Sequence, residues 1–361
     1  LGEGIWSPTW PVPGLADPEG FLSALENVYV ADDKKGARAE LSLGNECVDM
    51  GRILLDTFLA DPGKGMVHRQ KLLLKAASAI AGSDGSAETL VGAWRTVAKG
   101  IHAIGQVRQK GFCAVLPFAG VSMRWIIRPL VAQPENLTPG EKEYYTRYLF
   151  SNKKDGADTN FGVVLGKGVF RGESVMWMVR WCLVEALGHL KSARATVTGL
   201  IKKTEDAAAK ERLQLYAARI GALACCTASI KNCIMFQYAL DIREQPQFGP
   251  NQMDYDDNII YDLRGINQRK IAREELDNAA ELIAILEANK NCCIIDSARI
   301  PEEENVFMFG PDFIGDLKRK MDIMLDHWPD FENLYPATKM YDFEPDAPAN
   351  IIPPHGDQTC D

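Results

Sequence analysis

Apolar residues recur at every third or fourth position through most of this chain, from residue 20 to residue 330. In a helix this spacing gathers apolar side chains on one face, which can pack into a core. The helical segments do not alternate with runs of β-branched residues, which argues against a doubly wound sheet. We therefore predict a mainly all-α fold, with helices over residues 19–30, 40–60, 66–82, 86–109, 140–151, 172–202, 205–241, 266–289 and 311–327.

One apolar segment departs from this pattern. Residues 112–133 are interrupted by Pro117 and Pro129, and proline removes a backbone donor from helices and strands alike. The segment fits either a short buried helix or a pair of strands. If it is helical, Arg124 and Arg128 lie one turn apart on the same face.

The two ends of the chain lack helical periodicity. Residues 1–20 contain four prolines together with Trp6 and Trp10, which predicts an extended arm whose indole rings dock on an apolar surface. That surface belongs either to the same molecule or to a neighbour, so Trp6 and Trp10 are the candidate oligomerisation residues. Residues 330–361 are acidic and rich in proline, and we expect an extended or disordered tail there.

A glycine-rich segment divides the helical part of the chain. Residues 152–172 contain five glycines and four basic residues. We predict that this segment joins an N-terminal helical lobe (21–151) to a C-terminal helical lobe (173–329), with a basic cleft between them. The glycine spacing in 166–172 fits neither a dinucleotide fingerprint nor a P-loop, which favours a mobile loop or hinge.

Positive charge is concentrated in one stretch of the sequence. Residues 64–231 contain 25 Lys and Arg against 12 Asp and Glu, a balance of +13. The rest of the chain contains 15 against 37, a balance of −22. Such a segment is typical of a protein that binds a polyanion, and nucleic acid is the commonest one. The alternative is a solvated basic surface without a ligand.

Several cations recur at helical spacing, as repeated phosphate contacts require. Arg95 and Lys99 form one stripe together with His102, and Arg180, Lys191, Arg194 and Lys202 form another on a second helix. Tyr145 and Tyr148 lie beside basic residues and are candidates for base stacking. The candidate RNA-binding residues are Arg95, Lys99, Arg124, Arg128, Arg147, Lys153, Lys154, Lys167, Arg171, Arg180, Lys191, Arg194 and Lys202. We expect no role in RNA binding for Lys318, Arg319 and Lys320, which lie in an acidic neighbourhood.

Other chemistry finds little support in the sequence. No set of His and Cys has zinc spacing, and no Ser/His/Asp pattern is present, so we expect neither a metal nor a cofactor. The odd number of cysteines and their apolar settings predict reduced, buried thiols in a cytosolic or nuclear compartment, and adjacent cysteines such as those at 225–226 and 292–293 rarely bridge each other. We find no apolar run of about 18 residues that would predict a membrane span, and no signal peptide at the start of the chain.

The order of arm, helical lobe, basic joint, helical lobe and acidic tail resembles that of the nucleoproteins of negative-strand RNA viruses. Within it, residues 170–190 (FRGESVMWMVRWCLVEALGHL) resemble the RNA-facing helix that follows the lobe junction in that family. The resemblance implies two lobes that clamp single-stranded RNA, terminal arms that exchange between neighbours, and a polymer in the virion and in the host cytoplasm or nucleus. It also implies contact with a viral phosphoprotein or polymerase. Helical capsid proteins of other RNA viruses share this layout.

The leading hypothesis is a non-enzymatic protein that coats single-stranded RNA and assembles with copies of itself. Two other classes stay open. One is an all-α enzyme that uses haem or an isoprenoid diphosphate, and the other is a helical scaffold whose basic face binds an acidic protein.

Overall fold

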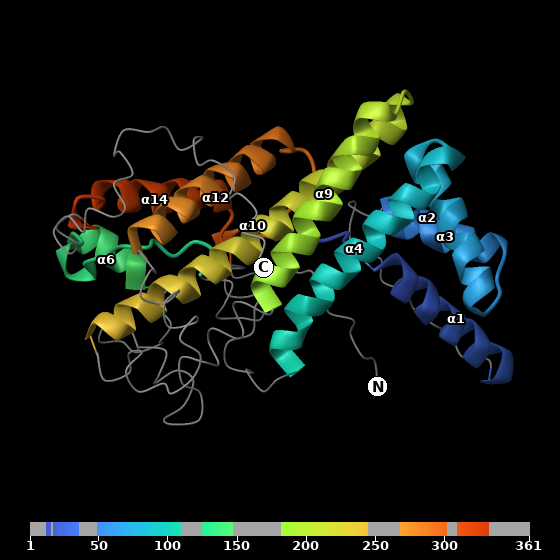
Figure 1. The fold of residues 1–361 in the computed structure, drawn as a ribbon, viewed down its shortest axis with the longest axis horizontal. Helices are drawn as coiled ribbons and strands as arrows, with labels where there is room; N and C mark the ends of the chain where they lie inside the picture. Colours follow the sequence, from blue (N-terminus) through green and yellow to red (C-terminus); the bar gives the residue numbers. More distant parts are fainter. Residues whose placement is uncertain are drawn as a thin grey trace, which may run out of the picture.

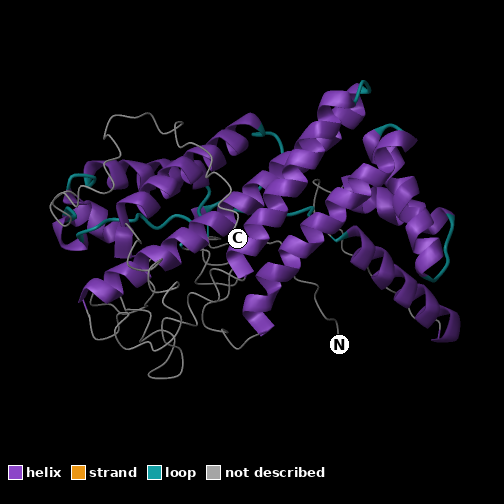
Figure 2. Ribbon diagram, in the orientation of Figure 1, coloured by secondary structure: helices purple, strands orange, loops and turns teal. Residues whose placement is uncertain are grey.

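The computed structural model describes residues 12–15, 17–35, 49–109, 125–146, 182–244, 268–301 and 309–331. Helices make up 78% of this part of the chain, and none of it forms a strand (Figure 2). The prediction of a mainly all-α protein is therefore confirmed.

The helices follow the predicted segments closely. Most of their ends fall within three residues of the predicted ends, while the predicted starts at 40 and 172 and the predicted end at 151 lie outside the described residues. The helices are α1 (Pro18–Lys35), α2 (Asp49–Ala60), α3 (Met66–Ala81), α4 (Asp84–Gln109), the 3₁₀ turn η2 (Pro134–Asn136), α6 (Pro139–Thr146), α9 (Glu185–Lys203), α10 (Ala207–Glu244), α12 (Gln268–Ala288) and α14 (Phe313–Asp326).

Local sequence explains where several helices begin. At α6, the Thr138 amide donates to Glu141 Oε2 (2.8 Å) and the Glu141 amide donates to Thr138 Oγ1 (3.4 Å), which is a capping box. At α14, the Asp312 carboxylate accepts from the Gly315 amide at 2.9 Å. These side chains satisfy backbone donors that the first helical turn leaves without partners.

The helices lie in a row that can be followed in Figure 1. α1 to α4 occupy one end, α9 and α10 the middle, and α12, α14 and α6 the other end. Each helix packs on the next in space: α3 on α4, α4 on α9, α9 on α10, α10 on α12 and α12 on α14. One hydrophobic core runs along this row, from Val12 to Phe331.

The core crosses the boundary predicted between the two lobes. α4 precedes the predicted joint and α9 follows it, yet these two helices pack along each other. They run antiparallel, with Ala103 and Ile104 against Ala186 and with Gly100 against Leu190. The joint at 152–172 lies outside the described residues, and the division into lobes stays a prediction.

The described half of the 112–133 segment is neither helix nor strand. Residues 125–127 form a turn and 128–133 continue as irregular chain, and every side chain from Trp125 to Ala132 is buried. The segment then leads to α6, where Tyr144 Oη donates to the Asp316 carbonyl of α14 at 2.9 Å. Residues 125–146 thus pack at the α14 end of the row, away from α1 to α4 (Figure 1).

The second half of the predicted N-terminal arm packs on the protein itself. Val12 and Leu15 are fully buried in the main core, and Pro18 begins α1. An exchangeable arm can therefore span at most residues 1–11, which include Trp6 and Trp10 and lie outside the described residues. At the other end, Phe331 is buried, and the acidic tail beyond it lies outside the described residues as well.

α10 is the central helix of the described chain. Its segment Ala207–Phe236 is long and apolar enough to cross a membrane, which the sequence analysis did not anticipate, but 78% of its most apolar window is buried inside the protein. A core helix has the same length and composition, and the burial of α10 by α9 and α12 fits that role.

Candidate nucleic-acid interface

Arg95, Lys99 and His102 are exposed on one face of α4, as their spacing predicts. The opposite face of this helix contributes Val97 and Ile101 to the core. Packing of the apolar face therefore holds the polar stripe toward solvent, where a large ligand can reach it.

An open groove of about 500 Å³ borders this face of α4. It is lined by the first turn of α1, by α4 and by the start of α9, through Asp17, Glu19, Arg95, Ala98, Lys99, His102, Ala103, Glu185 and His189. Three carboxylates thus face two permanent cations and two imidazoles. The groove has a mixed charge, and a phosphate would meet both signs in it.

Arg95 has two partners at the edge of the groove. Its Nε donates to Glu19 Oε2 of α1 at 3.1 Å, and its Nη2 donates to Gln70 Oε1 of α3 at 2.7 Å. The Arg95 and Glu19 side chains are 47% and 43% exposed, so water and salt screen the ion pair. The pair is therefore weak enough for another anion to replace the carboxylate.

The cations of α9 do not join this groove. His189 lines it, whereas Lys191 lies about 160° further round the helix and is exposed, as is Lys202. Arg194 crosses α10 instead and pairs with Glu281 of α12. A Cβ atom at Gly221 of α10 would lie 2.8 Å from Arg194 Cζ, so the glycine leaves room for this crossing.

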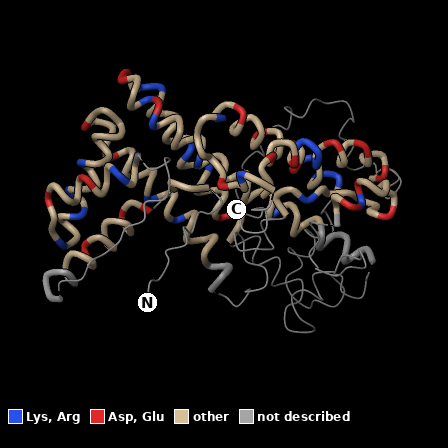
Figure 3. The backbone as a smooth tube through the Cα atoms, turned by 180° about the vertical axis from the view of Figure 1, so that it is seen from behind, with Lys and Arg blue, Asp and Glu red and all other residues tan. Residues whose placement is uncertain are grey.

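The two basic stripes thus lie on different faces of the described helices, and the predicted convergence in one cleft is not seen there. Figure 3 shows Lys and Arg positions interspersed with Asp and Glu along both ends of the row. The ion pairs Arg95–Glu19 and Arg194–Glu281 bring carboxylates from outside the basic segment next to cations within it.

Two predicted contact residues lie inside the protein. Arg128 is 1% exposed, and its Nη2 donates to Tyr145 Oη at 3.0 Å. Tyr145 is 4% exposed and packs with Val131, Leu137 and Ile323. Neither side chain is open to RNA, and we leave both out of the proposed interface.

More than half of the predicted contact residues lie outside the described part of the chain, so their positions relative to the groove stay predictions. They are Arg124, Arg147, Lys153, Lys154, Lys167, Arg171, Arg180 and the stacking candidate Tyr148.

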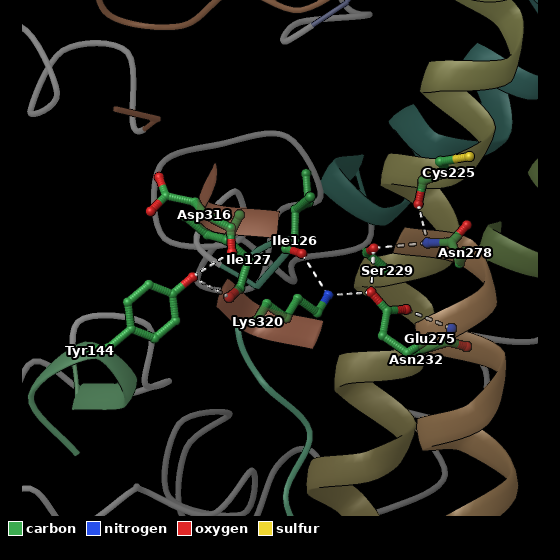
Figure 4. Close-up of polar contacts among 10 residues, drawn as sticks. All are labelled: Ile126, Ile127, Tyr144, Cys225, Ser229, Asn232, Glu275, Asn278, Asp316 and Lys320. Atoms are coloured by element: carbon green, nitrogen blue, oxygen red, sulfur yellow. Dashed lines mark hydrogen bonds and ion pairs between the residues drawn. The ribbon is translucent and has the colours of Figure 1, made fainter. Parts of the chain in front are cut away.

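A buried polar cluster, which the sequence analysis missed, joins α10, α12 and α14 (Figure 4). Lys320 pairs with Glu275, and both side chains are at most 1% exposed. The Glu275 carboxylate also accepts from Ser229 Oγ (2.6 Å) and from Asn232 Nδ2 (2.7 Å). Lys320 Nζ donates in addition to the Ile126 carbonyl at 2.7 Å. These bonds compensate two charges that are fully removed from water.

The sequence does contain a signal for this cluster. In α14, Lys320 continues the apolar series Phe313, Leu317 and Met324 at spacings of four, three and four residues. In α12, Glu275 lies on the buried face in the same way. A lysine on one apolar stripe and a glutamate on another predict a buried ion pair, because neither charge can be buried alone.

A second cluster joins α6 to the end of α14. His327 Nε2 lies 3.2 Å from Glu141 Oε2, and its Nδ1 lies 3.2 Å from Asp330 Oδ2. Burial disfavours the imidazolium, but the two carboxylates outweigh it and raise the pKa of His327 above 6.5. Burial also opposes the charge of Glu141, yet the Thr138 bonds and His327 lower its pKa below 4.5. The His327 imidazolium and the Glu141 carboxylate are thus the favoured forms in this cluster.

We expect His327→Gln to lower the free energy of unfolding by about 1–2 kcal/mol near pH 5.5, measured by urea denaturation. The raised pKa of His327 means that its stabilisation is complete below 6.5 and is lost as the pH rises through the folded-state pKa. The lowered pKa of Glu141 means that its contribution is present above 4.5 and is lost at more acidic pH. The difference between variant and parent should therefore be largest between these values. A difference that grows toward alkaline pH would contradict this assignment.

The cysteine doublets differ from each other. Cys225 and Cys226 are buried free thiols; burial raises the pKa of Cys225 well above its usual value and that of Cys226 to about 12, so both are unreactive. Cys292 and Cys293 are exposed, and the prediction of burial is wrong for this pair. Within the described ranges, His, Cys, Asp and Glu side chains form no group of three that could hold a metal ion.

The chain was also compared with known proteins. No protein-family model, no curated protein and no solved structure matches it. Any functional conclusion therefore depends on the residues and contacts described above.

Proposed function

We propose that this protein coats single-stranded RNA and assembles with copies of itself along it. The observation that supports this most strongly is the +13 balance of residues 64–231, in a chain that is otherwise acidic. Part of this charge, Arg95 and Lys99, lies side by side on an exposed helix face next to an open groove. Paired cations at helical spacing suit a backbone that repeats one charge per nucleotide.

The proposed contact is made with phosphates rather than with base edges. Arg95 and Lys99 match the one charge that every nucleotide carries, and the lining of the groove beside them contains no Asn or Gln side chain that could read a base edge. Binding should therefore be nearly independent of RNA sequence and should weaken as salt concentration rises.

Self-assembly is the second part of the proposal. Its candidate link is the segment 1–11 with Trp6 and Trp10, which lies outside the described residues. Leu59, Met66 and Val67 are 63%, 82% and 88% exposed at the α2–α3 turn and offer apolar surface to a neighbouring molecule. The same proposal places the protein in a virion and in host cytoplasm or nucleus, with a viral phosphoprotein or polymerase as a further partner.

The test of RNA binding compares two double variants by fluorescence anisotropy with a labelled single-stranded RNA. Arg95→Gln with Lys99→Gln should weaken binding about 10-fold and make log affinity less dependent on log salt, by about 1.4 in slope. Lys318→Gln with Arg319→Gln is the matched control, because it also removes two exposed cations and one exposed ion pair, here with Glu287. The control should bind like the parent protein.

Three outcomes would overturn the proposal. Affinity that stays flat from about 50 to about 300 mM salt would exclude phosphate contacts. Equal losses in the two double variants would mean that α4 is not the interface. Binding to an acidic polypeptide such as polyglutamate, without binding to RNA, would favour the scaffold hypothesis.

A further inference from the structure

We infer that Arg95 is a phosphate site which the protein keeps occupied with its own carboxylate, Glu19, until RNA displaces it. The inference rests on the proposed function and adds a mechanism of regulation to it. A carboxylate and a phosphodiester both present anionic oxygens to a guanidinium, so they compete for the same donors.

The first turn of α1 is built to present Glu19 to the groove. Pro18 begins the helix, and the Asp17 carboxylate accepts from the Glu19 amide at 3.1 Å. Just before them, Val12 and Leu15 are fully buried and anchor the chain in the core. The position of Glu19 beside Arg95 is therefore set by the fold and does not depend on a mobile loop.

Arg95 remains oriented when Glu19 leaves. Its Nη2 donates to Gln70 Oε1 at 2.7 Å, and Gln70 carries no charge. This bond holds the guanidinium in place without neutralising it. Release of Glu19 would thus expose a charge that is already positioned, next to Lys99 on the same helix face.

The charge of the groove explains why displacement of Glu19 should favour RNA binding. Asp17, Glu19 and Glu185 outnumber Arg95 and Lys99, so the groove as it stands repels an anion in part. Without the Glu19 charge, two carboxylates (Asp17 and Glu185) would face two cations (Arg95 and Lys99). The Arg95–Glu19 pair is also half exposed, and such pairs are worth little in water, so RNA can replace it at low cost.

The experiment measures RNA affinity of Glu19→Gln against Glu287→Gln. Both substitutions remove one carboxylate from an exposed ion pair between two helices; Glu287 pairs with Lys318 at 2.8 Å, outside the basic segment. We expect Glu19→Gln to bind RNA about 2- to 5-fold more tightly than the parent protein, as loss of a weak competing pair implies. Glu287→Gln should change affinity by much less.

A third variant tests whether the effect of Glu19→Gln on RNA affinity depends on Arg95. When Arg95→Gln is already present, Glu19→Gln should raise RNA affinity no more than Glu287→Gln does. The guanidinium for which the carboxylate and the phosphate compete is then absent. A similar gain with and without Arg95 would show a general effect of net charge and would overturn the inference. Equal affinity of Glu19→Gln and the parent protein would overturn it as well. If the parent protein shows no salt-dependent RNA binding at all, the proposed function itself fails, so the two failures can be told apart.

Discussion

Replacing Lys320 with methionine is expected to lower the free energy of unfolding by about 3–5 kcal/mol. The substitution leaves the fully buried Glu275 carboxylate without its cation, in a site that water does not reach. It also removes the donor that binds the Ile126 carbonyl, so the turn at 125–127 loses this hydrogen bond to α14. Urea denaturation followed by far-UV circular dichroism would measure the loss.

A second variant separates charge from packing in this experiment. Combining Lys320→Met with Glu275→Gln should recover part of the stability, because the amide keeps an acceptor for Ser229 or Asn232 without a buried charge. Lys318→Met, two residues away and exposed, should change stability by less than about 0.5 kcal/mol. If Lys320→Met is as stable as the parent protein, the ion pair is not buried as described.

Replacing Leu190 with alanine should cost about 2–5 kcal/mol, measured by the same denaturation assay. Leu190 of α9 is fully buried and packs against Gly100 of α4, so its removal leaves a cavity between the two helices. Because α4 and α9 link the two ends of the row, loosening their contact should weaken the whole core and not one helix alone.

Gly100 provides the complementary test. In the parent protein a Cβ atom at this position would lie 3.2 Å from Leu190 Cγ and 3.3 Å from the Ala186 carbonyl oxygen, so alanine is crowded there. In the Leu190→Ala background this crowding is relieved on the Leu190 side. Gly100→Ala should then be neutral or stabilising, since alanine favours a helix over glycine by about 1 kcal/mol. A full additive loss in the double variant would contradict the described packing.

Helices are the part of this fold that the sequence predicts best. Their apolar stripes follow the 3.6-residue period, and start signals such as Thr138 with Glu141 depend only on residues three positions apart. Both signals depend only on residues that are close in the sequence, so they predict a helix without knowledge of the helices that pack on it. The same local rules correctly place Arg95, Lys99 and His102 on one face of α4.

Local rules do not identify the partner of a buried charge. Lys320 lies on the apolar stripe of α14, but only the packing of α14 on α12 shows that Glu275 compensates its charge. Arg128 and Tyr145 were predicted to meet RNA, and they are buried against each other instead. In each case a residue distant in the sequence supplies the compensating partner.

Sequence alone determined that this chain is helical, where most helices begin and end, and that its positive charge is concentrated at 64–231. Tertiary structure decided which of those charges face solvent, and it placed Glu19 beside Arg95 and Glu281 beside Arg194. The physical reason is the range of the interactions. Helix formation depends on neighbours within four residues, whereas burial and ion pairing depend on which helices pack together across the whole chain.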